Sequence, residues 1–207
     1  MIFHLPRLAA LLAALILAAT PSPAGTQGKL HADPESVKGK LLVASPDMAD
    51  PHFEKTVIFM VEHNEQGALG IVVNRVLGTG SATEILKGLG IDANEATGEL
   101  RLYLGGPVEP QVAFVVHSPD YADPQSHAIT ERLSVTSDAA ILEAISHGKG
   151  PSKELIAIGY SGWGPGQLEN EMARDSWYVA PADEDIVFSD DTESAWRRAL
   201  AISGVEL

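Results

Sequence analysis

Residues 39–75 read GKLLVASPDMADPHFEKTVIFMVEHNEQGALGIVVNR, and this stretch holds the clearest fold signals in the chain. Leu41–Ala44 is a short apolar run that ends at a Ser-Pro-Asp turn signal. Thr56–Val61 and Ala68–Val73 are continuous apolar runs, typical of strands buried on both faces. The polar segment Glu62–Gly67 lies between them, so the pair predicts a hairpin with a polar tip.

Outside this stretch, short apolar runs alternate with helical patterns. We expect strands over Leu100–Leu104, Val112–Val116, Leu155–Ile158, Trp177–Val179 and Ile186–Phe188. We expect helices over Ser81–Leu89, Ser137–His147 and about Gly166–Arg174, with Ser81 and Ser137 as caps, and a last helix that opens with Asp190 and Glu193 in capping-box spacing. The pattern predicts a single α/β domain, bordering on α+β, with a mixed, bent sheet and peripheral helices.

Composition limits the classes of partner. The chain has 207 residues with 28 acidic and 14 basic side chains, a net charge of -14. Binding to nucleic acid or to an anionic membrane surface needs clustered Lys and Arg, so this charge disfavours both. The chain contains no cysteine, which excludes disulfides, thiolate nucleophiles and Cys-ligated metals. We predict no cofactor.

The first 24 residues have the pattern of an export signal. Arg7 precedes the apolar run Leu8–Ala19, and small residues lead up to Ala24 as a cleavage site. The apolar run has 12 residues, whereas a membrane-spanning helix needs about 20, so no stable anchor is expected. The prediction is a signal peptide over 1–24, a flexible lead-in over 25–38 and one domain over 39–207. The protein would be periplasmic or secreted, or cytoplasmic if the start codon is mis-assigned.

Three blocks together resemble the YqgE/AlgH family. They are residues 41–75, Gly105-Gly106-Pro107-Val108 with Phe114–Ser118, and Gly159–Glu171 continuing through Trp177 to Asp183. The resemblance covers about Gly39–Val205. It implies a compact α/β fold with a bifurcated, barrel-like sheet, and it brings no established reaction. Relatives carry a transcriptional-regulator label and generally look cytosolic, whereas this chain begins with an export signal. The Gly78-Thr79-Gly80 segment also departs from the family pattern; we interpret it as a turn.

Glu62, His63 and Asn64 lie where a buried strand meets a turn. Strand alternation places Glu62 and Asn64 on one side and His63 on the other. Glu62 and His63 are candidates for acid/base catalysis, and with His117 for a metal site. The alternative is that they hydrogen-bond the turn and the strand end. Because no HExxH or similar spacing occurs, no metal site is predicted.

Two further segments are candidates for ligand contact. Asn74 and Arg75 follow the second buried strand, and Arg75 is suited to hold a carboxylate or phosphate, or else forms a surface ion pair. Gly105, Gly106 and Pro107 predict a tight turn. This turn is either structural or an unobstructed cleft wall.

The strongest candidate site follows the strand at Leu155–Ile158. Tyr160, Gly162 and Trp163 occupy a glycine-rich stretch expected to form a turn, and a helix follows it. Gln167 and Glu171 are four residues apart and share a helix face. These side chains either contact a ligand or pack and cap the helix.

Together these patterns predict an exported, non-catalytic member of the family that binds an unknown protein or small molecule. The expected cleft combines Glu62–Asn64 and Arg75, the Gly105–Pro107 turn, and Tyr160, Trp163 and Gln167. One alternative is a hydrolase or metal-assisted enzyme that uses Glu62 and His63. Another is a cytosolic transcriptional regulator, which requires that the export signal be spurious.

Overall fold

The computed structural model describes residues 36–205. The predicted signal segment, and the lead-in as far as residue 35, lie outside the described residues. Between residues 36 and 205, no helix is long and apolar enough to cross a membrane.

The described chain alternates short strands and short helices. The strands are β1 (Lys40–Ala44), β2 (Val57–Asn64), β3 (Gly67–Val72), β4 (Val76–Ser81), β5 (Glu99–Leu104), β6 (Val108–His117), β7 (His127–Ala128), β8 (Ser134–Thr136), β9 (Glu154–Trp163) and β10 (Trp177–Pro181). The helices are α2 (Ala82–Gly88), α3 (Ala139–Ser146), α4 (Gln167–Met172), α5 (Glu184–Val187) and α6 (Thr192–Ile202).

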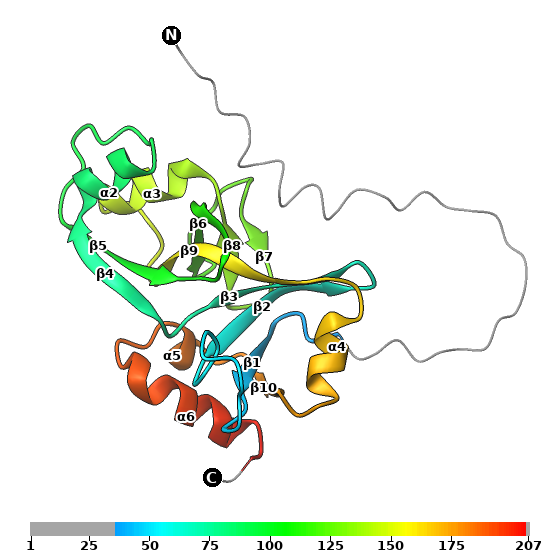
Figure 1. Ribbon diagram of the computed structural model, residues 1–207. Helices are drawn as coiled ribbons and strands as arrows, with labels where there is room; N and C mark the ends of the chain where they lie inside the picture. Colours follow the sequence, from blue (N-terminus) through cyan, green and yellow to red (C-terminus); the bar gives the residue numbers. More distant parts are fainter. Residues whose placement is uncertain (1–35, 206–207) are drawn as a thin grey trace, which may run out of the picture.

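All these strands belong to one sheet that branches at β9 (Figure 1). Its main order is β10-β1-β2-β3-β9-β6-β8-β7, with β4 and β5 beside this path. The first half of β9 pairs with β6 and, in parallel, with β5, while its second half pairs with β3. The prediction of a single α/β domain with a mixed, bent, barrel-like sheet and peripheral helices is therefore confirmed.

The sheet curls around one apolar cluster, the inner core. Leu41 and Val43 of β1 belong to it, and so does Val135 of β8 near the other end of the strand order. Strands so far apart in the order can share a core only if the sheet bends round it. Helix α6 contributes Trp196 and Leu200 to the inner core.

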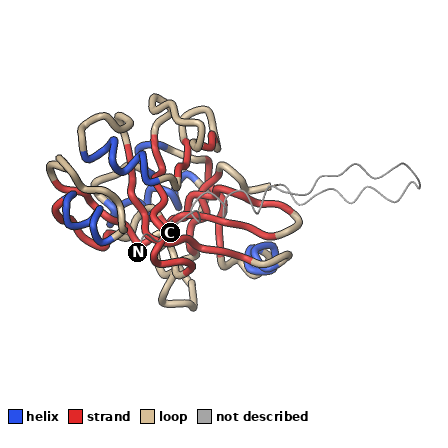
Figure 2. Tube along the Cα trace, turned by 90° about the horizontal axis from the view of Figure 1, so that it is seen from above, coloured by secondary structure: helices blue, strands red, loops and turns tan. Residues whose placement is uncertain are grey.

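Two further apolar clusters cover the outer face of the sheet, which points away from the inner core. Leu42 of β1 packs with Trp163, Leu168 and Trp177 in one of them, under α4. The other cluster lies between β5, β6 and β9 and the helices α2 and α3. Figure 2 shows this layering, with strands through the middle of the molecule and helices outside them. Because both faces are covered, β2 is apolar at every position from Val57 to Val61.

Two segments that were predicted as turns are strands in the structure. Tyr160–Trp163 was expected to be a turn, but it continues β9, where Gly162 pairs with Leu69 of β3. Gly78–Gly80 was also expected to be a turn, but it lies in β4 and pairs with β5. Both segments are glycine-rich, so their local preference is weak and pairing with a neighbouring strand decides their conformation.

Helix ends also differ from the prediction. Residues 186–188 were expected to form a strand, but helix α5 begins after Asp183, whose carboxylate accepts from the backbone N–H of Ile186. The residues that cap α3 and α6 are Asp138 and Asp191, one position after the predicted Ser137 and Asp190. Aspartate is a strong helix cap because its carboxylate accepts the free N–H groups of the first turn.

The Gly105–Pro107 turn is a point of close backbone contact. Gly105 accepts a hydrogen bond from the backbone N–H of Val72 at 2.9 Å. A Cβ added at Gly106 would lie 2.1 Å from the carbonyl carbon of Tyr160, and the φ angle of Gly106 is +156°. The turn therefore holds β5 against β9 at a distance that only glycine permits.

We predict that Gly106→Ala lowers the free energy of unfolding by roughly 3–4 kcal/mol, because the new methyl group meets backbone that cannot move aside. The matched control is Gly78→Ala. Gly78 has φ +157°, but no atom lies within 4 Å of its added Cβ. This control should lose about 1–2 kcal/mol from backbone strain alone. Urea denaturation measures both, and equal losses would show that the close contact at Gly106 has no effect.

Candidate functional site

The imidazole of His63 is fully engaged in structural hydrogen bonds. Its Nδ1 accepts from the backbone N–H of Val37 at 3.0 Å, so the ring proton lies on Nε2, which donates to Glu169 at 3.1 Å. Glu62 points to the other side of β2 and pairs with Lys38 at 3.0 Å. Glu62 and His63 thus contact different partners on opposite sides of β2, and the structure does not bring them together as an acid/base pair. Asn64 stays at the tip, where its side chain accepts from the backbone N–H of Gln66.

Glu171 hydrogen-bonds Trp163, Gln167 and Trp177, and we call these four side chains the latch. They do not form an open ligand surface. One oxygen of Glu171 accepts from the indole N–H groups of Trp163 at 2.9 Å and Trp177 at 2.8 Å. Its other oxygen accepts from the Gln167 amide at 2.9 Å, and Gln167 in turn accepts from the backbone N–H of Gly164. Trp163 is 8% exposed. These side chains bind one another and fix α4 to β9 and β10.

The hairpin tip and the latch lie side by side. Ala68 of the hairpin pairs with Trp163 of β9, and His63 reaches Glu169 on α4. The structure thus brings together the two regions expected to border one cleft. The contacts between them are direct hydrogen bonds and strand pairing.

Asn74 and Arg75 lie at the opposite end of the hairpin. The Asn74 side chain accepts from the backbone N–H of Val57, the first residue of β2, at 2.8 Å. Arg75 donates to the carbonyl oxygen of Glu54 at 2.9 Å. The predicted place of Arg75 in one cleft with Glu62–Asn64 is wrong, because the length of β2 separates Arg75 from them.

Tyr160 and Gly162 leave no room for a ligand between them. A Cβ at Gly162 would lie 3.2 Å from the Tyr160 ring, and that ring packs edge-on against Phe114. Burial, and secondarily the carboxylate of Glu109, raise the pKa of the Tyr160 phenol. Glu109 itself has φ +51° and a buried Oε2 without a hydrogen-bond partner among the described residues. This strained bulge belongs to the irregular start of β6.

His117 is buried in a polar network at the end of β6. Its Nδ1 donates to the carbonyl oxygen of Ser118 at 2.8 Å, so its Nε2 accepts from the hydroxyl of Thr136 at 2.9 Å. Burial lowers the pKa of His117, against the smaller opposing effects of the Ser118 bond and nearby carboxylates. The ring does not approach His63. Within residues 36–205, no group of three or more His, Asp or Glu side chains is placed to hold a metal ion.

One hollow lies elsewhere, where the two ends of the curled sheet face each other. We call it the seam hollow. It has a volume of about 530 Å³ and is lined by Gly39, Lys40, Thr130, Glu131, Arg132, Leu133, Val179, Ala180, Pro181, Ala182 and Glu184. One wall is thus β10 and the residues after it, and the other is the turn between β7 and β8. A Cβ at Gly39 would lie 3.0 Å from the Thr130 side chain, so the walls meet at one end.

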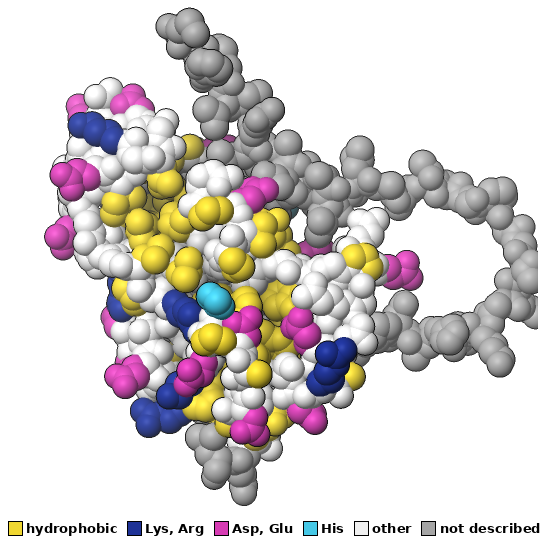
Figure 3. Space-filling model, in the orientation of Figure 1, with side chains coloured by type: hydrophobic (Ala, Val, Ile, Leu, Met, Phe, Trp, Pro, Cys, Tyr) yellow, Lys and Arg dark blue, Asp and Glu magenta, His cyan; other side chains and the backbone are white. Residues whose placement is uncertain are grey.

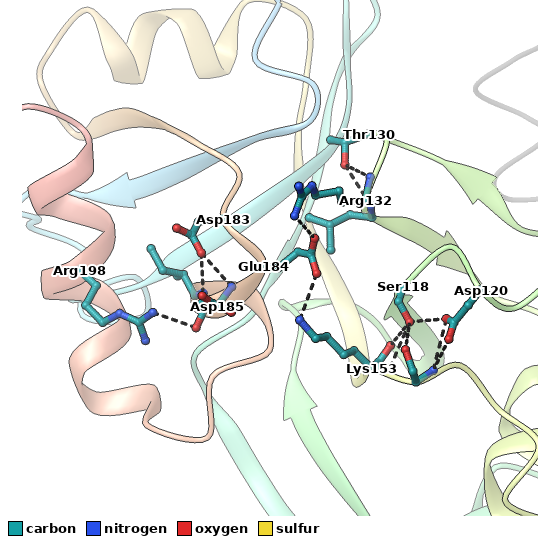
Figure 4. Close-up of polar contacts among 12 residues, drawn as sticks. Ser118, Asp120, Thr130, Arg132, Lys153, Asp183, Glu184, Asp185 and Arg198 are labelled. Atoms are coloured by element: carbon teal, nitrogen blue, oxygen red, sulfur yellow. Dashed lines mark hydrogen bonds and ion pairs between the residues drawn. The ribbon is translucent and has the colours of Figure 1, made fainter.

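Glu184 bridges the rim of the seam hollow (Figure 4). Its two carboxylate oxygens bind Arg132 at 3.3 Å and Lys153 at 3.1 Å. The Lys153 hydrogen bond, followed by that of Arg132, lowers the pKa of Glu184. Three cations, Lys40, Arg132 and Lys153, thus lie near two carboxylates, Glu131 and Glu184, so this rim is locally less acidic than the chain as a whole. On the face drawn in Figure 3, acidic side chains are scattered among basic ones.

None of the residues that line the seam hollow was predicted from the sequence as a candidate site residue. Arg132, Lys153 and Glu184 stand on three separate segments, and neither a shared motif nor a spacing connects them. Only closure of the sheet brings them together. The sequence predicted a strand over Trp177–Val179, but it did not predict that this strand lies at an edge of the sheet.

Comparisons with known proteins agree on one family. A family model described as AlgH-like matches residues 41–207. A UPF0301 protein of Methylococcus capsulatus is 42% identical over 177 residues, which is 86% of this chain and 95% of that protein. A UPF0301 protein of Ruegeria pomeroyi is 43% identical over 170 residues, or 81% and 92% of the two chains.

Two solved structures share the fold. The solution structure of AlgH from Pseudomonas aeruginosa has a TM-score of 0.70 and 37% identity, and covers 88% of this chain and 94% of its own. The crystal structure of DIP2367 from Corynebacterium diphtheriae has a TM-score of 0.65 and 26% identity, with 80% and 86% coverage. The printed names of these relatives state no reaction.

We predict that Glu171→Ala lowers the free energy of unfolding by roughly 3 kcal/mol, because it leaves two buried indole donors without an acceptor. Glu171→Gln retains one acceptor oxygen and should lose less, roughly 1–2 kcal/mol. The control is Glu65→Ala at the exposed hairpin tip. Denaturation followed by tryptophan fluorescence measures all three, and a loss at Glu171 no larger than at Glu65 would contradict the latch.

A second prediction concerns His117 and pH. Burial lowers the pKa of His117 in the native protein, while the unfolded chain takes up a proton near the ordinary histidine pKa of about 6.5. The contribution of His117 to stability is therefore complete above that pH and declines as the pH falls below it. His117→Gln should be less stable throughout, but its stability should fall less between pH 7 and 5, by at most about 1.4 kcal/mol per pH unit. Parallel slopes for the two proteins would rule out His117 as the titrating group.

Proposed function

The chain belongs to the AlgH-like family, and we propose from its sequence that it is exported and from its geometry that it is a non-catalytic protein that binds a partner in the seam hollow. The observation that carries the proposal is the combination of an open hollow at the seam with candidate catalytic groups that are all engaged in structural bonds.

The proposed absence of catalysis rests on hydrogen-bond occupancy. Both nitrogens of His63 and both of His117 have partners, and each ring's tautomer is set by a backbone group. Ser118 donates to Asp120 at 2.5 Å, but no imidazole stands beside this hydroxyl to act as its base. The hydrogen bonds from Ser118 and Ser152 lower the pKa of Asp120, so this carboxylate is a poor proton acceptor. None of the three candidate groups, His63, His117 and Ser118, thus combines a nucleophile with a free base.

The seam hollow has the features of a binding site. Its volume lies in the range of roughly 300–1,000 Å³ that is usual for ligand sites. Its floor is apolar, with Leu133 and Ala180 each 1% exposed, and its rim is charged. An apolar floor supplies affinity through burial, and a few charged groups at the rim orient the occupant.

Export is proposed from the first 24 residues. The apolar run Leu8–Ala19 and the small residues before Ala24 support a cleaved signal, and the family match begins only at residue 41. Export would place the protein where direct action on transcription is impossible. Mass spectrometry of the protein from its host checks this, with Gly25 as the expected first residue. An intact N-terminus on the bulk of the protein would contradict cleavage.

The binding proposal is tested by filling the seam hollow. We expect that metabolites and short peptides that bind the chain over residues 25–207 shift the NMR signals of Thr130–Leu133 and Val179–Ala182. Ala182→Trp should abolish these shifts, because the indole occupies the hollow. The matched control is Ala173→Trp, at an exposed position after α4, which should bind normally. Ligands whose binding is indifferent to Ala182→Trp would show that the seam hollow is not the site.

A further inference from the structure

Strand β10 is an edge of the sheet, and it borders the seam hollow. Among the described strands, β10 pairs only with β1. Val179, Ala180 and Pro181 of β10 line the hollow. An edge strand presents backbone N–H and C=O groups to whatever lies beside it. The seam hollow is therefore bordered by hydrogen-bonding backbone as well as by side chains.

The pairing register shows which backbone groups of β10 point away from β1. Ser45 donates to the carbonyl oxygen of Ser176, so these two form a hydrogen-bonded pair between β1 and β10. Hydrogen-bonded and non-bonded pairs alternate along an antiparallel ladder. The register Leu41↔Ala180 and Leu42↔Val179 then makes Ala180 a bonded residue and Val179 a non-bonded one. The N–H and C=O of Val179 consequently point away from β1, toward the free edge.

Pro181 fits the same arrangement. It stands opposite Lys40, two residues beyond Val179, and so its nitrogen also faces the free edge. Proline is tolerated there because no bond to β1 is lost. Its carbonyl oxygen still points outward as an acceptor. One side of β10 thus offers a donor and an acceptor at Val179, and a further acceptor at Pro181.

The charges at the rim favour an acidic occupant. The Arg132 side chain is 80% exposed and its Nη1 binds Glu184 at 3.3 Å. Lys153 already binds the other oxygen of that carboxylate. Glu184 is therefore shared between two cations, and the remaining Arg132 donors are available to a second carboxylate.

We propose that the seam hollow binds an extended segment of a partner protein, which pairs with Val179 as an added strand and places an acidic side chain beside Arg132. This inference rests on the proposed function, because it takes the seam hollow as the binding site. Main-chain bonds to the sheet edge supply the affinity, while the apolar floor and Arg132 select the side chains.

A second copy of this chain fits the hollow less well. Pairing β10 with the β10 of another copy needs the whole edge to be clear. The approach of Gly39 to Thr130 closes one end of the seam, and the turn over 130–133 stands opposite β10. A single extended segment that enters from the open end meets neither obstacle.

The first test uses amide hydrogen exchange of the wild-type chain, with the peptide acetyl-Thr-Val-Asp-Val-Thr-amide as probe. We expect the Val179 amide to exchange rapidly in the free protein. At a peptide concentration ten times the Kd, its exchange should slow about elevenfold, because only the free protein exchanges. The Ala180 amide, which bonds to β1, is the internal control and should change little.

The second test uses matched substitutions at Val179 and Arg132. Val179→Pro removes the outward N–H and should abolish peptide binding, whereas Val179→Ala keeps that N–H and should retain it. Arg132→Glu should weaken the Asp peptide about fivefold and favour the same peptide with Lys in place of Asp. Because the exchange experiment uses the unaltered chain, a misfolded Val179→Pro protein does not leave the proposal untested.

The outcomes separate the two proposals. If small ligands enter the seam hollow but the peptide leaves Val179 exchange unchanged, strand addition is wrong and binding at the seam stands. If neither binds there, both proposals fail. If the Val179 amide is protected without peptide, in a manner that depends on protein concentration, the occupant is a second copy and the partner-segment proposal is overturned.

Discussion

The fold depends on the close approach of three backbones at β9. This strand hydrogen-bonds β6 along one side and, on the other, β5 and then β3. The approach requires residues without a Cβ, and Gly106 and Gly159 supply them: an added Cβ at either would lie within 2.5 Å of backbone atoms across the contact. The branch at β9 bends the sheet, and the bend leaves its two ends facing each other.

The carboxylate of Glu171 and the imidazole of His63 are chemically reactive groups, but in this protein they form structural hydrogen bonds. Removing the Glu171 carboxylate from water costs free energy, and the hydrogen bonds from the indoles of Trp163 and Trp177 offset this cost. His63 similarly connects the hairpin to the segment before β1 and to α4. The polar groups near the hairpin tip therefore hold elements together across the sheet, and function has to be sought where backbone and side chains are still free.

The seam is such a place because a curled sheet that does not close leaves two edges. Full barrels remove their edges, whereas this sheet keeps β10 open beside a charged, apolar-floored hollow. Arg132, Lys153 and Glu184 come from different segments and meet only at this opening. The open edge at β10 and the charged rim of the seam hollow thus both result from the incomplete closure of the sheet.

The sequence by itself determined the hairpin of β2 and β3, the helices α2, α3, α4 and α6, and the mixed α/β class. Continuous apolar runs and helical periodicity are local signals that burial of both faces preserves. The tertiary structure alone decided that Tyr160–Trp163 extends β9, that Glu171 joins two tryptophans and that Arg132 stands beside Glu184. The physical reason is that these contacts join residues brought together by strand pairing and curvature, and no short stretch of sequence encodes the distance between two sheet edges.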